Sequence, residues 1–426
     1  MTRVLVLGGY GLIGSACMRA LVGAGMQIAG LGRSQKRALR SDPTAKWIIR
    51  DIPSLSIEDW LEILVNFDVV VNASGALQDG ARDSLQAIHV QAVERLTNAA
   101  RRCGVRIVQI SAAGVSPDAP TEFFRSKARG DAIIIELAPD WVILRPTLVI
   151  SPEAYGGTAL LRAVASLPGV CPVVFPDAQV QTVHIDDVAA AVVRAANGEV
   201  PSGTIADLTE PEAQSFPDLI LKMRRWLGVG KGVSVRVPNW VIDLSGKTAD
   251  LLGYLGWRSP LRTTALHALQ GGIRGDASSW PYTCRPLSVT LLNLPATRQE
   301  RSFARLYLLL PLAIATLAIF WTISGLIGLF ETDMAVKTLT DRGVIPFFAA
   351  ISVGGGIVAD IALGFAILWR RWTRLAALGM IVLSVVYLLG AAVLTPDLWR
   401  DPLGPMIKVF PGMTLALFIW LLIEDE

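Results

Sequence analysis

The sequence predicts an α/β fold, a doubly wound parallel sheet with a small mixed C-terminal lobe, followed by an all-α four-helix transmembrane bundle. Three observations support this organisation. Short β-branched runs alternate with helical patterns through the N-terminal half. A glycine-rich turn directly follows the first of these runs. Near residue 305 the composition changes to long apolar segments.

The predicted strands are short, apolar and rich in β-branched residues, as is typical of strands buried in a parallel sheet. They comprise residues 4–7, 27–31, 69–72, 106–111 and 141–145. From about residue 205 to 300 the pattern is mixed, prolines and glycines interrupt it, and no repeat is obvious. We therefore divide the chain into an α/β domain over residues 1–204, a lobe and linker over 205–300, and a membrane domain over 301–426.

The composition limits the classes of protein to consider. Of 426 residues, 52% are hydrophobic and only 18% are charged, so part of the chain is expected to lie in lipid. The net charge of +3, without a dense basic run among aromatics, argues against nucleic-acid binding. The cysteines are far apart, which disfavours a disulfide framework or a metal site and indicates a reducing compartment. They are Cys17, Cys103, Cys171 and Cys284.

Four long apolar segments follow Arg305 and predict the membrane domain. They comprise residues 306–330, 344–369, 373–394 and 406–423. A helix that crosses the hydrocarbon core needs about 20 apolar residues, so all but the last are comfortably long. A buried helical core is the alternative, but four such segments in a row argue against it.

Arginines on both sides of the first two segments predict the orientation in the membrane. They are Arg298, Arg301 and Arg305 before the first segment, and Arg370, Arg371 and Arg374 after the second. Two spans separate the clusters, so both lie on one side, which the positive-inside rule assigns to the cytoplasm. Residues 4–7 lead straight into glycines, unlike a secretory signal. We therefore expect a multi-pass protein of the inner (cytoplasmic) membrane, with its α/β domain on the cytoplasmic side.

The turn after the first strand has the glycine spacing of a dinucleotide site. Gly8 allows the tight turn, Gly11 lets the backbone approach a pyrophosphate, and Gly14 permits close packing of helix on strand. The helix that begins there offers N–H groups and the positive end of its dipole. These features predict a Rossmann NAD(P)-binding site; a tight turn without a ligand is the alternative. The other predicted contacts in this turn are Tyr10, Leu12 and Ile13.

The end of the second strand predicts which nucleotide is bound. An acidic residue there would accept from the ribose 2′-hydroxyl of NAD, whereas this chain has Arg33 followed by Ser34. An arginine can pair with a 2′-phosphate through its planar fork, so we favour NADP(H) over NAD(H) and assign both residues to the site. A solvated surface arginine is the alternative, because further basic residues follow. They are Lys36, Arg37 and Arg40.

Two later strand ends complete the predicted nucleotide site. Asp51 follows the third strand and is placed to reach the adenine. Ala73, Ser74 and Gly75 follow the fourth strand and should line the ribose.

With these residues identified, the N-terminal part of the chain resembles the short-chain dehydrogenase/reductase superfamily. The spacing is that of its extended and atypical branches, and it is similar to the group that includes the nucleotide-binding accessory subunit of respiratory complex I. The residues that carry the resemblance are Gly8, Gly11, Gly14, Asn72 to Gly75, Ser111, Arg145 with Pro146, and His184 to Ala189. The C-terminal part resembles the DoxX-like four-helix membrane family, through Phe320, Trp321, Gly325 and residues 396–405.

The resemblance implies a catalytic pair, a tyrosine followed four residues later by a lysine. This chain has the lysine of the pair but not the tyrosine. In active members the tyrosine transfers the proton, the lysine lowers its pKa and holds the ribose, and a serine hydrogen-bonds the carbonyl. This chain has Lys127, but Phe123 stands at the tyrosine position and has no ionisable proton. Lys127 is expected to bridge the ribose hydroxyls, with a surface lysine as the alternative. Ser111 either contacts substrate or cofactor, or caps the next loop.

Other residues near the predicted site are expected to be structural. His184, at a strand end, is more typical of a satisfied core group than of a catalyst, and Asp186 and Asp187 suit the first turn of the next helix. Tyr155 is a weak candidate for a substitute tyrosine.

Asp360 lies deep in the second apolar segment, where an ionised carboxylate is unfavourable unless paired or hydrated. One hypothesis is that it lines a polar site inside the bundle for a quinone or lipid-like substrate. The other is that it hydrogen-bonds neighbouring helices as part of their packing.

Two functions follow from these patterns. The first is a membrane-anchored NADP(H)-dependent oxidoreductase acting on a lipophilic substrate such as a quinone or isoprenoid, in contact with membrane lipid. The second is a non-catalytic nucleotide-binding scaffold, sensor or assembly factor of a membrane redox complex, which is the function that Phe123 favours. Nucleic acid is not an expected partner of either.

Overall fold

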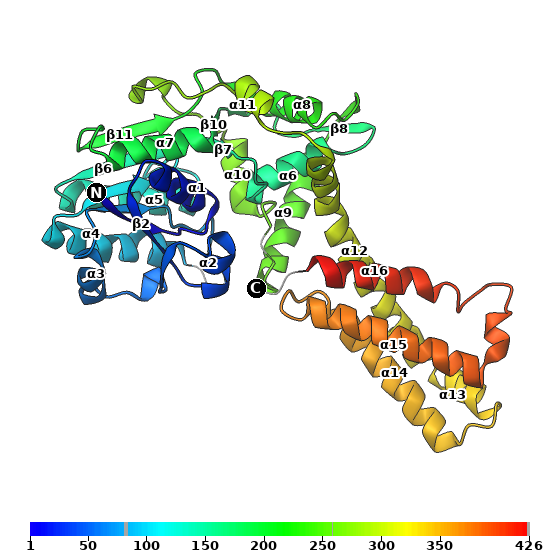
Figure 1. Cartoon of the computed structure of the whole chain (residues 1–426). Helices are drawn as coiled ribbons and strands as arrows, with labels where there is room; N and C mark the ends of the chain where they lie inside the picture. Colours follow the sequence, from blue (N-terminus) through cyan, green and yellow to red (C-terminus); the bar gives the residue numbers. More distant parts are fainter. Residues whose placement is uncertain (81–83, 258, 424–426) are drawn as a thin grey trace. The chain divides into compact units, whose positions relative to one another are not determined.

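The computed structural model describes residues 1–80, 84–257 and 259–423 of the chain, which is coloured by sequence in Figure 1. The chain divides into two compact units. Unit 1 comprises Met1–Asp250 and Ser259–Ala304, and unit 2 comprises Leu251–Arg258 and Arg305–Glu426.

Unit 1 contains a seven-stranded sheet in which every neighbouring pair is parallel. In spatial order the strands are β11 (Thr204–Leu208), β6 (Trp141–Pro146), β5 (Arg106–Ile110), β4 (Val69–Asn72), β1 (Arg3–Leu7), β2 (Gln27–Gly32) and β3 (Lys46–Ile49). The chain runs outward from β1 to β3 and then returns to β4 on the other side of β1. The order therefore reverses between β1 and β4, and the crevice beyond their carboxyl ends is where such sheets bind ligands.

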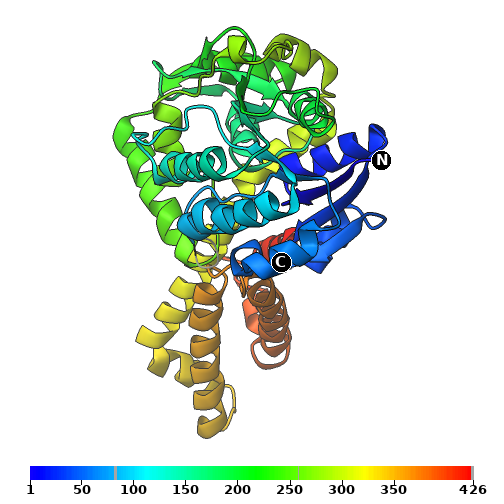
Figure 2. The same ribbon diagram turned by 90° about the vertical axis from the view of Figure 1, so that its left-hand side faces the viewer.

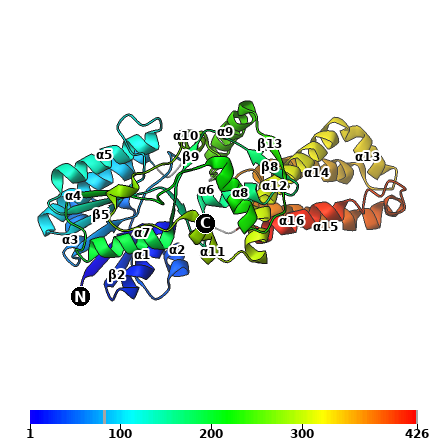
Figure 3. The ribbon, with the colours of Figure 1, turned by 90° about the horizontal axis from the view of Figure 1, so that it is seen from above.

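Alternate residues of each strand belong to two separate hydrophobic cores, because both faces of a parallel sheet are buried. Val4 and Val6 of β1 belong to one core, whereas Leu5 and Leu7 belong to the other. The first core packs against α1 (Leu12–Gly23) and α7 (Ile185–Ala196). The second packs against α3 (Ile57–Leu64), α4 (Ala92–Cys103) and α5 (Glu122–Leu137). Figure 3 shows these two helical layers on opposite sides of the sheet.

The doubly wound parallel sheet and its five predicted strands are confirmed. One boundary needs correction: the division after residue 204 cuts β11, because Thr204–Leu208 pairs in parallel with β6 and forms the edge of the sheet. This strand is short and carries the charged Asp207, so its pattern did not distinguish it from the lobe that follows. The other limits of the predicted domains stay predictions.

The rest of unit 1 forms a smaller mixed lobe of paired strands and helices, drawn mostly in green in Figure 2. The strand pairs are β7 (Leu148–Ile150) with β10 (Thr182–His184), β9 (Gln179–Val180) with β12 (Gln214–Ser215), and β8 (Val170–Val173) with β13 (Val233–Arg236). The helices are α6 (Gly156–Ala165), α8 (Phe216–Trp226), α9 (Asn239–Tyr254), α10 (Thr263–Gln270) and α11 (Leu287–Asn293).

The buried carboxylate of Glu210 connects two parts of this lobe through hydrogen bonds. One carboxylate oxygen accepts from the Thr182 N–H at 2.8 Å, and the other accepts from the Leu287 N–H at 2.7 Å. A buried carboxylate is tolerated when its oxygens are hydrogen-bonded in this way. Glu210 therefore joins β10 to the start of α11 across a long stretch of sequence.

Unit 2 is helical, and its helices are α12 (Arg298–Phe330), α13 (Thr332–Thr340), α14 (Pro346–Ala366), α15 (Thr373–Leu394) and α16 (Val409–Leu422). The division between the units falls inside α12 and near the end of α9. Among the described residues, α12, α14 and α15 are long and apolar enough to cross a membrane. Much of their apolar surface faces outward, with Leu312 61% exposed and Val358 68% exposed. Lipid is the natural cover for such a surface.

The predicted fourth span is shorter than expected. It begins at Val409 instead of residue 406, and its 14 residues rise about 21 Å, which is less than the hydrocarbon core of about 30 Å. Pro411 explains the late start, because proline suits the first turn of a helix and disrupts its interior. The helix runs beside α15 in Figure 1, and its Ala416 and Ile419 are buried in the core of unit 2. The four-helix arrangement is thus present, with three helices of spanning length among the described residues.

Glycines bring α12 and α14 close together. A Cβ atom added to Gly364 would collide with the Thr322 hydroxyl and lie 2.8 Å from the Thr322 backbone nitrogen. A Cβ on Gly325 would lie 3.1 Å from the Asp360 Cβ. Small residues that let helix backbones approach are a common packing device in membranes.

We expect Gly364→Ala to destabilise unit 2 although alanine favours helices. The added methyl has to displace α12, and overpacking of this kind costs about 1–3 kcal/mol. Gly354→Ala is the matched control on the same helix, because its Cβ meets nothing within 4 Å. The measurement is thermal unfolding of the full chain in detergent. Equal midpoints for the two variants would contradict the close α12–α14 contact.

Candidate functional site

The glycine turn forms a tight cradle between β1 and α1. Gly8 has a φ of +68° and its N–H donates to the Leu31 carbonyl at 3.0 Å, while the Gly11 N–H donates to the Gly8 carbonyl at 2.8 Å. A Cβ on Gly14 would collide with the Gly8 carbonyl oxygen and lie 2.8 Å from the Gly8 carbonyl carbon. Only glycine fits here, which is the close packing of helix on strand that the sequence predicts.

The N-terminus of α1 is left open toward the crevice between β1 and β4. Gly11 caps the helix without a side chain, and the first turn has no acidic residue. The first N–H groups of a helix have no intrahelical partner, so those of Leu12 and Ile13 can receive an anion. A dinucleotide pyrophosphate fits a cradle of this shape and charge.

Tyr10 connects the glycine turn to the end of β2. Its hydroxyl accepts from the Arg33 N–H at 3.1 Å, and a Cβ on Gly32 would collide with its ring. The Arg33 side chain is exposed where β2 ends, in the position where the adenosine ribose is expected. Ser34 caps α2 (Gln35–Ser41) by accepting from the Arg37 N–H at 3.4 Å.

The remaining predicted nucleotide residues lie at neighbouring strand ends. Asp51 follows β3 and is exposed, at the start of a short turn over Ile52–Ser54. Ser74 is held by Asn72, which accepts from the Ser74 N–H at 3.2 Å and donates to Gln109 at 2.8 Å. These contacts fix the loop that begins after β4.

Lys127 lies under this loop and is only 7% exposed, so the alternative of a surface lysine is wrong. Its Nζ donates to the Ile110 carbonyl at 3.1 Å and lies 5.8 Å from the centre of the Phe123 ring. Burial lowers the pKa of this ammonium. An ammonium has three donors, which suits a group that also holds ribose hydroxyls.

Ser111 lies in a buried ionic cluster beside Lys127. Its hydroxyl donates to the Asp131 carboxylate at 2.7 Å, and the same oxygen pairs with Arg145 at 3.2 Å. Asp131 is 1% exposed, and burial raises the pKa of its carboxyl. The hydroxyl proton of Ser111 is therefore already used in a buried hydrogen bond to Asp131. The neighbouring side chains Ala112 and Ala113 bring no hydroxyl of their own.

His89 is a second buried group that the sequence did not single out. It lies in the π-helical turn Ala87–Gln91 that precedes α4. Its Nε2 accepts from the Ala76 N–H at 3.2 Å, and its Nδ1 lies 2.9 Å from the Ser126 hydroxyl. Burial and the nearby Lys127 charge lower the His89 pKa to about 3. His89 is therefore neutral near pH 7 and is not a proton donor in place of the missing tyrosine.

The predicted structural residues behave as expected. His184 is buried and caps α7, with its Nδ1 accepting from the Asp186 N–H at 3.1 Å. Asp186 and Asp187 lie in the first turn of that helix, and Asp187 pairs with Arg285 at 2.7 Å. Tyr155 is 61% exposed at the start of α6.

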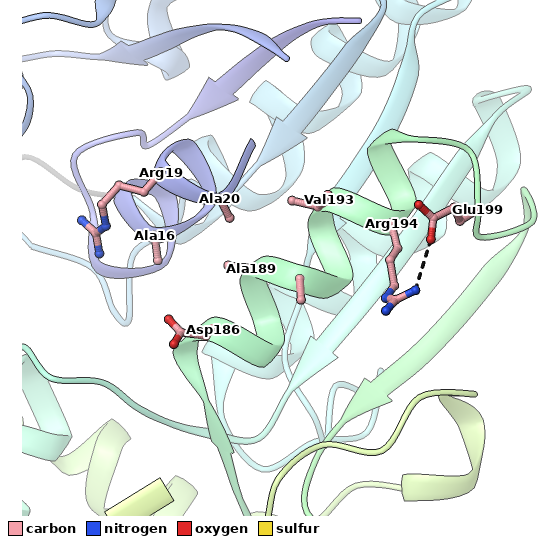
Figure 4. A pocket seen from close by; sticks show the side chains of 9 residues that line it. Ala16, Arg19, Ala20, Asp186, Ala189, Val193, Arg194 and Glu199 are labelled. Atoms are coloured by element: carbon pink, nitrogen blue, oxygen red, sulfur yellow. Dashed lines mark hydrogen bonds and ion pairs between the residues drawn. The ribbon is translucent and has the colours of Figure 1, made fainter. Parts of the chain in front are cut away.

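An open groove lies between the bodies of α1 and α7 and encloses about 560 Å³ (Figure 4). Its lining residues are Ala16, Arg19, Ala20, Asp186, Ala189, Ala190, Val193, Arg194 and Glu199. Arg194 pairs with Glu199 at 3.2 Å at one end. None of the predicted nucleotide residues lines it, so it is separate from the glycine cradle.

In unit 2, Asp360 on α14 is buried and bonded to both neighbouring long helices. Ser324 of α12 donates to one carboxylate oxygen at 2.9 Å, and Tyr387 of α15 donates to the other at 2.7 Å. These bonds fit the packing hypothesis for Asp360. The hypothesis of a polar ligand site stays a prediction.

The sequence matches two families in separate segments. Residues 4–205 match the NAD dependent epimerase/dehydratase family, and residues 318–417 match the DoxX-like family. Among solved structures, the chain is similar to the Bordetella bronchiseptica enzyme WbmH in complex with NAD+. That match has 18% identity and a TM-score of 0.46 and covers 56% of this chain and 86% of the other.

Three curated relatives are each similar to part of the chain. The NADH-ubiquinone oxidoreductase 40 kDa subunit of Neurospora crassa is 25% identical over 39% of this chain and 45% of its own length. The NADH dehydrogenase [ubiquinone] 1 alpha subcomplex subunit 9 of Dictyostelium discoideum is 22% identical over 51% and 62%. Ceramide reductase of Caulobacter vibrioides is 22% identical over 52% and 68%. This chain thus spans under half of the Neurospora protein.

His89 should make the stability of unit 1 depend on pH. Its folded pKa of about 3 lies below its ordinary value of 6.5, so between these values the unfolded chain binds a proton that the folded chain excludes. Stability therefore falls as the pH drops through 6.5, by about 2 kcal/mol in all between pH 7.5 and pH 5.

Urea unfolding of the full chain at pH 7.5 and pH 5.0 measures this effect. His89→Asn removes the titrating group, so the variant should lose about 2 kcal/mol less than the wild type over that range. An equal loss in both proteins would show that His89 does not titrate in this way.

Proposed function

Because this chain joins an NAD-dependent epimerase/dehydratase-like segment to a DoxX-like membrane segment, we propose that it is a membrane-anchored NADP(H)-dependent oxidoreductase with a lipophilic substrate. The observation that carries the proposal is the glycine cradle, in which Gly14 has no room for a side chain against Gly8. Such close packing directs the N-terminus of α1 at a pyrophosphate.

The preference for NADP(H) rests on charge at the end of β2. Residues 27–41 contain no acidic side chain to accept from a ribose 2′-hydroxyl. Arg33 is exposed there, beside further basic residues on α2. A guanidinium forms two parallel hydrogen bonds with a phosphate, so this surface suits the 2′-phosphate of NADP(H).

The lipophilic substrate is proposed because the chain joins a nucleotide-binding segment to a membrane segment. Unit 2 presents apolar helices of membrane-spanning length, and the arginine clusters favour unit 1 at the cytoplasmic face of the inner membrane. A quinone, an isoprenoid or a lipid carbonyl would be available at that face. The similarity to a protein named ceramide reductase agrees with a lipid-like carbonyl substrate.

The residues of the site are suited to holding the cofactor more than to moving protons. NADPH supplies a hydride when it is bound. In this proposal Lys127 binds the ribose, whereas Phe123 has no proton to give and the Ser111 hydroxyl donates to Asp131. Reduction of a quinone or ketone also consumes one proton for each hydride, and neither Phe123 nor the engaged Ser111 hydroxyl is suited to supply it.

Three groups in the site favour a second function, a non-catalytic nucleotide-binding subunit or sensor of a membrane redox complex. Phe123, the engaged Ser111 and the neutral His89 are what a site that binds without turnover would contain. The Neurospora and Dictyostelium relatives are named as subunits of NADH-ubiquinone oxidoreductase, which agrees with this alternative.

Arg33→Ala should change which nucleotide is preferred. We expect the Kd for NADPH to rise about tenfold, equivalent to 1.4 kcal/mol, and the Kd for NADH to stay the same. Calorimetric titration of both nucleotides measures the ratio. Arg101→Ala, at an exposed position near the end of α4, is the control and should leave both affinities unchanged. An unchanged NADPH affinity in Arg33→Ala would contradict the NADP(H) assignment.

Turnover separates the two candidate functions. The full chain in lipid nanodiscs is mixed with NADPH and either decylubiquinone or a long-chain ketone, and the loss of NADPH absorbance is followed. The oxidoreductase should oxidise NADPH only with an acceptor present. Phe123→Tyr should raise the rate for the ketone at least tenfold, because it restores a proton donor beside Lys127.

Two variants of α1 serve as controls for this experiment. Gly14→Ala should abolish nucleotide binding, whereas Gly23→Ala on the same helix has open space around its Cβ and should behave as the wild type. If the wild type and Phe123→Tyr both bind NADPH tightly and neither oxidises it, the oxidoreductase is rejected and the scaffold is supported.

A further inference from the structure

His89 takes part in a one-directional chain of hydrogen bonds. The Ala76 N–H can only donate, so His89 Nε2 accepts and carries no proton. The proton therefore lies on Nδ1 and is donated to the Ser126 hydroxyl, which in turn donates to the Phe123 carbonyl at 3.1 Å. This sequence of donors and acceptors admits one tautomer of the neutral imidazole.

The chain of hydrogen bonds joins two segments that the sequence separates. Ala76 belongs to the loop after β4 that is expected to line the ribose. Ser126 belongs to α5 and directly precedes Lys127. Both Ser126 and His89 are buried, at 0% and 4% exposure, so water does not compete for these bonds.

Two glycines lie in close contact with the same histidine. A Cβ on Gly130 of α5 would collide with the His89 carbonyl, so the π-helical turn lies directly against α5. A Cβ on Gly75 would lie 3.2 Å from His89 Nε2 and 3.8 Å from Lys127 Nζ. The imidazole and the ammonium thus meet at Gly75, in the loop after β4. Single π-helical turns of this kind are frequent at functional sites.

We propose that His89 is a positioning residue which locks the loop after β4 to the helix that carries Lys127, and so forms the subsite for the nicotinamide-side ribose. This proposal rests on the proposed nucleotide site. His89 touches the loop and the helix and acts on the cofactor through them. The adenosine half is assigned to other elements, namely the ends of β2 and β3.

The proposal predicts that the two halves of the cofactor respond differently to changes at His89. In His89→Leu, which fills the space without hydrogen bonds, the Kd for NADPH should rise about tenfold or more. The Kd for adenosine 2′,5′-bisphosphate, which lacks the nicotinamide half, should remain within twofold of the wild type. A general loss of structure would weaken both ligands, so the ratio of the two constants reports positioning.

Three further variants make the test independent of folding. Ser126→Ala removes the hydroxyl that accepts from His89 and donates to the Phe123 carbonyl, without altering the histidine. It should shift the ratio in the same direction by a smaller factor. His89→Gln retains an amide that can accept from Ala76, so it should recover part of the NADPH affinity. His184→Asn is the matched control, because it changes another buried histidine that caps α7 and should leave the ratio unchanged.

The outcomes separate this proposal from the proposed function. A wild type that binds neither ligand would reject the nucleotide site itself. A wild type that binds both, with His89→Leu weakening both equally or neither at all, would reject the role of His89 and leave the nucleotide site standing. A selective loss of NADPH affinity in His89→Leu and Ser126→Ala would establish it.

Discussion

The site in unit 1 depends on the close approach of α1 to the turn after β1. Because Gly14 has no side chain, the helix can begin against the Gly8 carbonyl, and its open N-terminus faces the crevice between β1 and β4. The order of strands then places the loop after β4 on the other side of that crevice. The cradle, the loop after β4 and Lys127 lie near one another because the sheet reverses its order there.

Burial of charge is the second constraint, and it limits what the site can do. Lys127, Asp131 and Arg145 lie close together, and each is engaged by hydrogen bonds or ion pairs, since isolated buried charges are strongly unfavourable. Ser111 is held by this cluster through Asp131, and His89 is held by its own hydrogen bonds to Ala76 and Ser126. Holding these groups in fixed positions favours precise binding of a cofactor, but it leaves few groups free to transfer protons.

The membrane unit follows a different rule, because lipid does not drive apolar helices together. Glycines at Gly325 and Gly364 let α12 and α14 approach, and Asp360 bonds to hydroxyls on both α12 and α15. A carboxyl group with a donor on each oxygen therefore joins three helices. The outward apolar faces of these helices remain available to lipid.

The sequence by itself determined the elements whose signals are local. Strand runs, the glycine turn and the apolar segments each depend on neighbouring residues, so they could be predicted, as could Phe123 at the tyrosine position. It missed β11, whose five residues become a strand only by pairing with β6, and it overestimated the last apolar helix, which starts late at Pro411. The partners of Lys127, Ser111 and His89 were decided by tertiary structure alone. Asp131 lies 20 residues from Ser111, and Ser126 lies 37 from His89, so only the packing of α5 against β5 and the π-helical turn brings them within hydrogen-bond distance.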